Sequence, residues 1–120
     1  MLELLISLQI ALKNLSITLD AYANYETPQE IIMATTTAYA SLEELTDSTP
    51  FITASGTTTR KGIVANNCLK FGTKIIIDQI IYEVQDRMNK RYGCNYYDLW
   101  FENKNDALQY GVQRKQIKIL

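Results

Sequence analysis

Two aspartates occur where a carboxyl group could transfer protons. Asp98 lies within an alternating stretch of aromatic and apolar residues, and Asp86 follows a similar alternation at the end of another stretch. Burial raises the pKa of a carboxyl group, and a second carboxylate nearby raises it further. A carboxyl group that keeps its proton near neutral pH can act as the general acid on a glycosidic bond. The alternative is that Asp98 faces water and accepts hydrogen bonds from loop backbone.

Aromatic and basic side chains surround these aspartates in the sequence. The aromatic residues are Tyr92, Tyr96, Tyr97, Trp100 and Phe101. Such rings, Trp100 among them, can stack on the apolar C–H faces of a bound sugar, or they can pack within a core. The loop expected at 86–93 carries Arg87, Lys90 and Arg91. These cations could bind carboxylates on a ligand or could keep a hairpin tip solvated.

The composition excludes several kinds of site. The 120 residues include no His, which excludes Ser-His-Asp and Cys-His catalytic units and any His-containing metal site. Two Cys are too few for a structural zinc site, so we expect no metal. The 12 basic and 13 acidic side chains give a net charge of −1, which does not favour a nucleic-acid partner.

Charge is divided unevenly along the chain. Residues 1–59 carry one basic and seven acidic side chains, whereas residues 60–120 carry eleven basic and six acidic ones. This division indicates either pairing between the halves on a solvated surface or a basic groove for an anionic polymer.

The first thirty residues have the pattern of an amphipathic helix. Leucines recur at steps of three and four, at Leu5, Leu8, Leu12, Leu15 and Leu19. We predict an N-terminal helical extension over 1–30 that packs on the domain or self-associates through residues 4–19. The alternative is an atypical export or membrane-surface segment. The segment lacks the basic start of a signal peptide, and no apolar run is long enough for a transmembrane span.

Residues 31–120 have the pattern of a small, mainly β domain. Turn residues separate six or seven predicted strands, at 31–39, 51–55, 62–65, 73–77, 80–84, 96–101 and 115–120, with one short helix at 105–110. Asp78 and Gln79 are expected to form a two-residue hairpin turn, although the favoured Gly is missing. Short strands in this number favour a small barrel or sandwich, whose closure removes exposed edges.

Cys68 and Cys94 each lie in a predicted loop. They could form a disulfide that closes a loop of about 25 residues and stabilises the fold by about 3 kcal/mol, as in an oxidising compartment. The alternative is two free thiols.

Several short motifs follow one another in a recognisable order. They are TASGT at 53–57, GIVANN at 62–67, FGTK at 71–74, VQDRMN at 84–89, YDLW at 97–100, then Ala107 and Gly111. In this order they resemble the three-aspartate (3D) domain family. That family is similar to the catalytic barrel of membrane-bound lytic transglycosylase A and, more distantly, to expansin-like barrels. The resemblance covers residues 32–120 and implies that 31–120 form a six-stranded double-psi β-barrel with an open groove.

The resemblance also implies an activity. Members of the family cleave peptidoglycan glycan strands between N-acetylmuramic acid and N-acetylglucosamine without consuming water, and they leave a 1,6-anhydro sugar. One acidic residue protonates the glycosidic oxygen and then accepts the proton of the attacking 6-hydroxyl. No metal and no cofactor are needed. Such a function is expected in the cell envelope or outside the cell.

The family's functional positions can be assigned to residues of this chain. The last aspartate matches Asp98, the expected general acid and base, and the middle aspartate matches Asp86, which would tune Asp98. Asn67 stands where the family has its first aspartate, so that position keeps hydrogen bonding but loses a negative charge. Arg87-Met88-Asn89 replaces the usual Thr-Gly-Gly, and Lys70 stands in place of Pro. The resemblance assigns substrate contacts to Ser55, Gly56 and Thr73.

Two other functions compete with the transglycosylase. One is a non-catalytic glycan-binding or expansin-like module, which would use the groove and the aromatic residues without cleaving a bond. The other is a structural protein that assembles through the N-terminal helix.

Overall fold

The structure is a computed structural model that describes residues 30–41 and 51–120. Within these residues it contains strands β1 (Glu30–Ala40), β2 (Ile63–Ala65), β3 (Lys74–Ile77), β4 (Ile80–Asp86), β5 (Tyr96–Phe101) and β6 (Gln113–Ile119), and the helix α2 (Lys104–Tyr110). The predicted N-terminal helix lies outside the described residues. None of the helices in the described part of the chain is both long and apolar enough to cross a bilayer.

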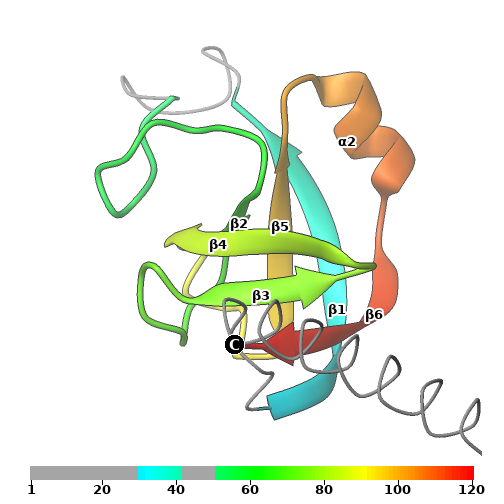
Figure 1. Cartoon of the computed structure of the whole chain (residues 1–120). Coiled ribbons are helices and arrows are strands. Elements are labelled where there is room, and N and C mark those ends of the chain that lie inside the picture. The colour runs from blue at the N-terminus through cyan, green and yellow to red at the C-terminus, as the bar shows by residue number, and fades with distance from the viewer. Residues whose placement is uncertain (1–29, 42–50) are drawn as a thin grey trace, which may run out of the picture.

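The six strands close into a barrel in the order β1-β5-β2-β4-β3-β6. Two of the pairings, β1 with β5 and β2 with β4, are parallel, and the others are antiparallel. β3 and β4 cross the molecule at a steep angle to β1 and β5 (Figure 1). The mainly β fold expected from the strand pattern is therefore confirmed, and of the barrel and the sandwich that the pattern favoured the structure has the barrel.

The core follows from the alternation of side chains along each strand. In β5, Tyr97 and Leu99 are buried while their neighbours are not, and in β3 the same holds for Ile75 and Ile77. The core cluster comprises Ala34, Val64, Ile75, Ile77, Val84, Tyr97, Leu99 and Ile117. Because these positions face inward, the intervening residues of β1 and β5 are left on the other face.

A tight turn joins β3 to β4. Asp78 and Gln79 have φ values of 50° and 68°, the left-handed conformation that a two-residue hairpin requires. The predicted turn is thus confirmed without the usual Gly, and Lys115 on β6 forms an ion pair of 2.7 Å with Asp78.

Helix α2 packs against β1 and β5 at one end of the barrel. Asn103 caps its N-terminus by accepting a hydrogen bond of 2.9 Å from the backbone N–H of Asp106. Gly111 ends it with φ of 63°, and Ala107 is its buried residue. The short helix expected before Gly111 is therefore confirmed.

The prediction of a strand at 51–55 was wrong. The structure has one isolated bridge there, between Ile52 and Thr58, and the backbone N–H of Thr53 bonds to the carbonyl of Thr57 at 2.8 Å. The Thr53 hydroxyl lies 2.7 Å from that of Thr57 and 3.0 Å from that of Ser55. Hydroxyl groups that bond locally compete with a strand ladder, which explains the compact turn.

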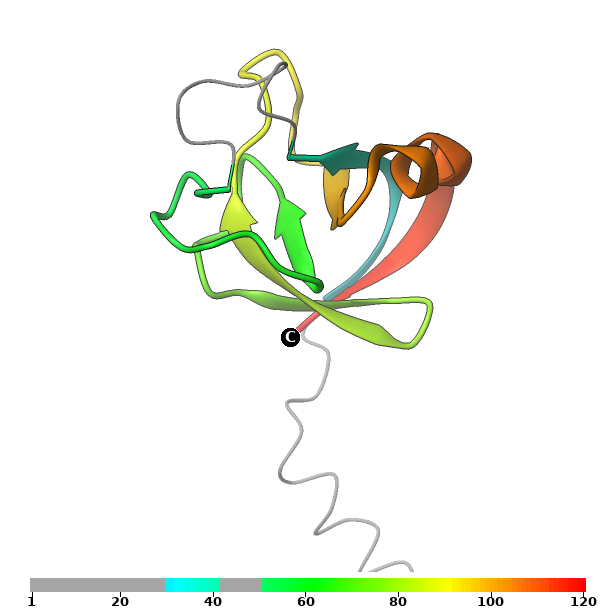
Figure 2. The ribbon, with the colours of Figure 1, turned by 90° about the horizontal axis from the view of Figure 1, so that it is seen from above.

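Cys68 and Cys94 form a disulfide with their Cα atoms 5.4 Å apart. The bond links the β2–β3 connection to the loop between β4 and β5. This loop, drawn in yellow, projects beyond the strands (Figure 2). Of the two alternatives left by the sequence, the disulfide is the one found.

Candidate functional site

The two candidate carboxylates lie in one row across neighbouring strands. Thr37 on β1 pairs with Asp98 on β5, and Ala65 on β2 pairs with Asp98 on one side and with Asp86 on the other. Since cross-strand neighbours point to the same face of a sheet, Thr37 and both aspartates share a face. Ala65 between them has only a methyl group, so the space above it stays open.

An irregularity in the β2–β4 pairing places Asp86 in this row. Val64 is opposite Val84, so regular pairing would put Gln85 opposite Ala65, but the register shifts and Asp86 takes that position. Such bulges re-aim a side chain next to many functional sites. Asp86 therefore owes its orientation to the bulge as well as to its place at the end of β4.

Asp98 is partly buried and engages Thr37. The Thr37 hydroxyl donates a hydrogen bond of 2.8 Å to Asp98 Oδ1. Burial is the largest influence and raises the pKa of Asp98 above its ordinary value of 3.8; the Thr37 hydrogen bond lowers it, and the charge of Asp86 raises it. The net result is a carboxyl group that holds its proton to a higher pH than a solvated aspartate does.

Asp86 is an acceptor for three donors. Its Oδ2 accepts from the Tyr39 hydroxyl at 2.6 Å, and its Oδ1 accepts from the backbone N–H groups of Ala54 and Arg87, each at 2.9 Å. An ionised carboxylate is acceptor-only, so this arrangement suits the charged form. The Tyr39 bond joins β1 to β4, which are not neighbours in the barrel.

The Tyr39 hydroxyl remains a donor at all physiological pH values. Burial raises its pKa far above the ordinary value, and the hydrogen bond to Asp86 raises it further. Tyr39 and Thr37 are functional candidates that sequence reasoning missed. Their alternation along β1, away from the buried Ala34 and Thr36, places them on the side-chain face that carries Asp98.

A cavity of about 430 Å³ opens beside Asp98. Its lining comes from β1, from the end of β2, from β5 and from the β4–β5 loop: Thr37, Ala38, Tyr39, Ala65, Arg87, Met88, Asn89, Tyr92 and Asp98. This volume is within the range of small-ligand pockets. Of the residues singled out from the sequence, Asp98, Arg87 and Tyr92 line it, and Asp86 is bonded to Tyr39 of the lining.

Asn67 holds the loop that forms one wall of the cavity. Its amide nitrogen donates to the carbonyls of Asn89 at 2.9 Å and Tyr92 at 3.0 Å, and its oxygen accepts from the backbone N–H of Met88 at 2.8 Å. The structure therefore gives the side chain predicted to bind substrate a structural role. It does not line the cavity.

Asn66, which sequence reasoning missed, anchors the other end of the same loop. Its fully buried side chain donates to the carbonyls of Cys94 and Tyr96, each at 3.0 Å, and accepts from the backbone of Cys68 and Leu69. Together with the disulfide, the two asparagines fix the loop to the β2–β3 connection. The Asn-Asn pair directly after the strand predicted at 62–65 was the only signal in the sequence for this anchor.

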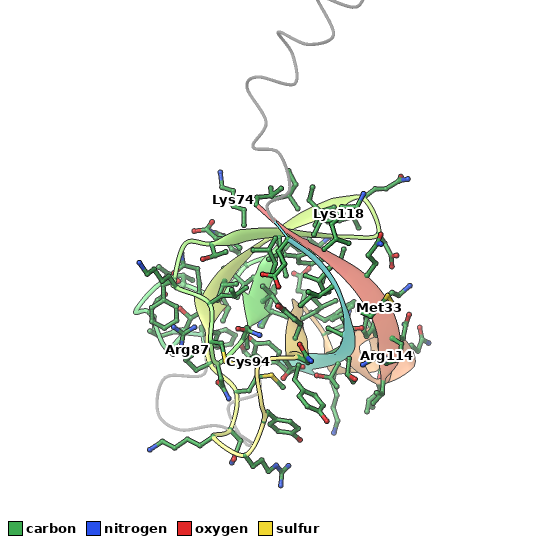
Figure 3. All side chains as sticks on the ribbon, turned by 90° about the horizontal axis from the view of Figure 1, so that it is seen from below. Met33, Lys74, Arg87, Cys94, Arg114 and Lys118 are labelled. Carbon is green, nitrogen blue, oxygen red and sulfur yellow. A yellow bond between two sulfur atoms is a disulfide. The ribbon has the colours of Figure 1, made fainter. Side chains whose placement is uncertain are left out.

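Arg87 is held against the cavity by two contacts. Its Nη1 donates to the carbonyl of Asn66 at 2.7 Å, and its guanidinium carbon lies 3.9 Å from the centre of the Phe71 ring. Figure 3 shows Arg87 and Cys94 on one side of the barrel and Arg114 on the other. The guanidinium is therefore held in place by Asn66 and Phe71, and Arg87 lines the same cavity as Asp98.

The other predicted contacts lie outside the cavity lining. Ser55 and Gly56 belong to the turn whose Ala54 bonds Asp86, and Thr73 accepts from the backbone of Val84 at 2.9 Å. The Trp100 indole donates to Ser41 Oγ at 2.9 Å, two residues along β5 from Asp98. Their roles as glycan contacts stay predictions.

Within residues 30–41 and 51–120, no three Cys, Asp, Glu or His side chains come together as a metal site would need. No family model matches the chain, and no curated protein is significantly similar to it. The functional proposal therefore rests on the geometry of Asp86, Asp98 and the cavity.

Proposed function

We propose that this protein cleaves peptidoglycan glycan strands as a lytic transglycosylase, with Asp98 as general acid and then general base. One observation carries the proposal: a partly buried carboxyl group of raised pKa opens into a cavity of about 430 Å³ beside a second, fully bonded carboxylate. Two carboxyl groups in such different surroundings are what an acid and a charged stabiliser require.

In the first step the protonated Asp98 donates its proton to the oxygen of the glycosidic bond. The C1–O bond breaks with both electrons going to that oxygen, and positive charge develops at C1 and the ring oxygen. Asp86 stabilises this charge because its three hydrogen bonds hold it in place as an acceptor. Asp98, now ionised, keeps the hydrogen bond from Thr37.

In the second step the 6-hydroxyl of the same sugar attacks C1. Asp98 accepts the hydroxyl proton as the new C1–O bond forms, which yields the 1,6-anhydro ring and restores the protonated acid. No water enters the balance. A group with a raised pKa suits both steps, because it must give up and regain a proton near neutral pH.

The strand pairings of the barrel support the proposed assignment to the three-aspartate domain family. Six strands with two parallel pairs, β1 with β5 and β2 with β4, agree with a double-psi topology for residues 31–120. The sequence resemblance assigns Asp86 and Asp98 to the last two aspartates of the three-aspartate domain. We propose membership of that family, with a location in the cell envelope, on these grounds.

A second candidate is a glycan-binding module that cleaves nothing. Asn67 favours it, because the family's first aspartate is replaced by a residue fully engaged in holding a loop. Asp98→Asn separates the two functions: an enzyme loses on the order of a thousandfold in turnover, since one group performs both proton transfers, whereas a binder keeps its affinity.

The experiment incubates purified peptidoglycan with the wild type and with the Asp98→Asn variant, and analyses the products by mass. The proposal expects anhydro-muropeptides from the wild type and none above background from the variant. Glu102→Gln, an exposed acid just beyond β5, is the matched control and should keep full activity. Equal product from Asp98→Asn would refute the assignment.

A further inference from the structure

The wall of the cavity formed by the β4–β5 loop is positively charged. Arg87 lines the cavity, Lys90 is exposed, and Arg91 lies over the Tyr92 ring with its guanidinium carbon 4.9 Å from the ring centre. Tyr92 also lines the cavity. Asp98 lines the same cavity, so a bound ligand would meet both an acid and the Arg87 cation.

Arg87 is the best-placed of these cations. Within the described part of the chain, the ion pairs are Arg60 with Glu83 and Lys115 with Asp78, and Arg87 takes part in neither. Its neighbour Asp86 accepts from the backbone N–H of Arg87, not from the guanidinium. No carboxylate among the described residues pairs with the guanidinium, and a ligand that supplies a negative charge would stabilise this partly buried cation.

The contacts of Arg87 leave donors for such a ligand. A guanidinium has five N–H donors in a fixed planar fork, and the bond to Asn66 uses Nη1. The Phe71 ring beneath it restricts the side chain without using a donor. A guanidinium that is held in place and has unused N–H donors is suited to bind a carboxylate through two parallel hydrogen bonds.

We propose that Arg87 forms a carboxylate subsite and that the substrate is a glycan strand with a free carboxylate on the sugar next to the cleaved bond. This rests on the proposed function and deepens it. In peptidoglycan the lactyl group of N-acetylmuramic acid has a free carboxylate only where its stem peptide has been removed. The reaction that supplies the substrate is therefore hydrolysis of the amide between the lactyl group and the first amino acid.

The test compares binding of the full chain to three strand preparations. The first is peptide-free with free lactyl carboxylates, the second is the same material with those carboxylates converted to neutral amides, and the third bears stem peptides. We expect binding to the first to be about tenfold tighter than to the second, in line with a charge-assisted bidentate pair. The preference should weaken as salt is raised.

Variants assign the preference to Arg87. Arg87→Gln should reduce the difference between the first two preparations to less than about twofold, and Arg87→Lys should retain only part of it. Arg114→Gln is the matched control, because Arg114 is exposed on β6 away from Arg87 (Figure 3), and it should leave the preference intact. Circular dichroism of each variant establishes that it is folded.

The outcomes separate this inference from the proposed function. Equal binding to free and amidated strands, or no binding to either, overturns the carboxylate subsite even if anhydro products form. Tighter binding to the peptide-bearing strands than to the peptide-free ones also overturns it, since the carboxylate would then belong to the peptide. A preference for free carboxylates without any cleavage supports the subsite and refutes the transglycosylase.

Discussion

At the scale of single residues, the protonation of Asp98 is a balance between burial and one hydroxyl. Burial and the charge of Asp86 raise its pKa, and the Thr37 hydrogen bond opposes them. A stronger bond from Thr37 would lower the pKa of Asp98, so that less of the group would hold a proton to donate and its carboxylate would be a weaker base. In the proposed mechanism Asp98 serves in both roles, so this balance would set the pH range of activity.

Thr37→Val should shift the protonation equilibrium of Asp98 toward its protonated form. The isosteric side chain cannot donate, so the ionised form of Asp98 loses a hydrogen bond and the pKa of Asp98 rises further. The alkaline limb of the kcat/KM profile should move to higher pH. Thr35→Val, on the same strand, is the control and should leave the profile in place; an unmoved limb in Thr37→Val would contradict this role.

Asp98→Asn should also change stability in a pH-dependent way. The folded pKa of Asp98 is raised, so its contribution is fully present below the unfolded value of about 3.9 and is lost as pH rises through the folded value. We expect the variant to match the wild type in acid and to become the more stable protein near neutral pH. Denaturant unfolding across this range measures the difference; a constant difference would argue against burial of the charge.

At the scale of elements, the β4–β5 loop is held in place by side chains from the end of β2. Asn66 and Asn67 bond its backbone from both ends, and the disulfide adds a covalent tie. The cavity wall is therefore preorganised. These bonds require an asparagine at position 67, since the carboxylate of an aspartate has no N–H to donate to two carbonyls.

Asn67→Asp, which introduces the residue that the proposed family has at this position, should therefore destabilise the protein. The change removes two donated hydrogen bonds and turns a charge toward the carbonyls of Asn89 and Tyr92, at a cost of about 1–3 kcal/mol. Thermal unfolding measures this effect. Asn95→Asp, in the exposed part of the loop, is the control and should change stability by less than about 0.5 kcal/mol.

At the scale of the whole molecule, a small barrel is closed by pairings between distant parts of the chain. β1 pairs with both β5 and β6, and the parallel β1–β5 pair places Thr37 beside Asp98. The covalent link between Cys68 and Cys94 ties two connections at one side of this barrel. Reducing the conformational freedom of the unfolded chain in this way stabilises the native state.

Replacing both cysteines by serine should lower the free energy of unfolding by about 3 kcal/mol. A disulfide that joins residues separated by 26 positions removes loop entropy from the unfolded chain. Guanidinium unfolding with and without reductant measures the effect. The wild type should respond to reductant and the double variant should not; a wild type indifferent to reductant would contradict the contribution.

The part of this site that could be predicted from the sequence is the part that local pattern controls. Alternation along 96–101 predicted a strand there that carries Asp98, and the structure has that strand with the same bounds. Thr37 and Tyr39 were missed because their role depends on which strand lies beside β1, and β5 is some sixty residues away. The prediction of a strand at 51–55 was wrong because local hydrogen bonds between hydroxyl groups override the β propensity of these residues.

The central claim is that Asp98 makes a sugar hydroxyl, not water, the nucleophile. Digestion of peptidoglycan in ¹⁸O-labelled water followed by mass analysis of the new ends tests it directly. The proposed mechanism predicts anhydro ends that contain no label and that depend on Asp98. Labelled reducing ends, or unlabelled anhydro ends made equally well by Asp98→Asn, would contradict it.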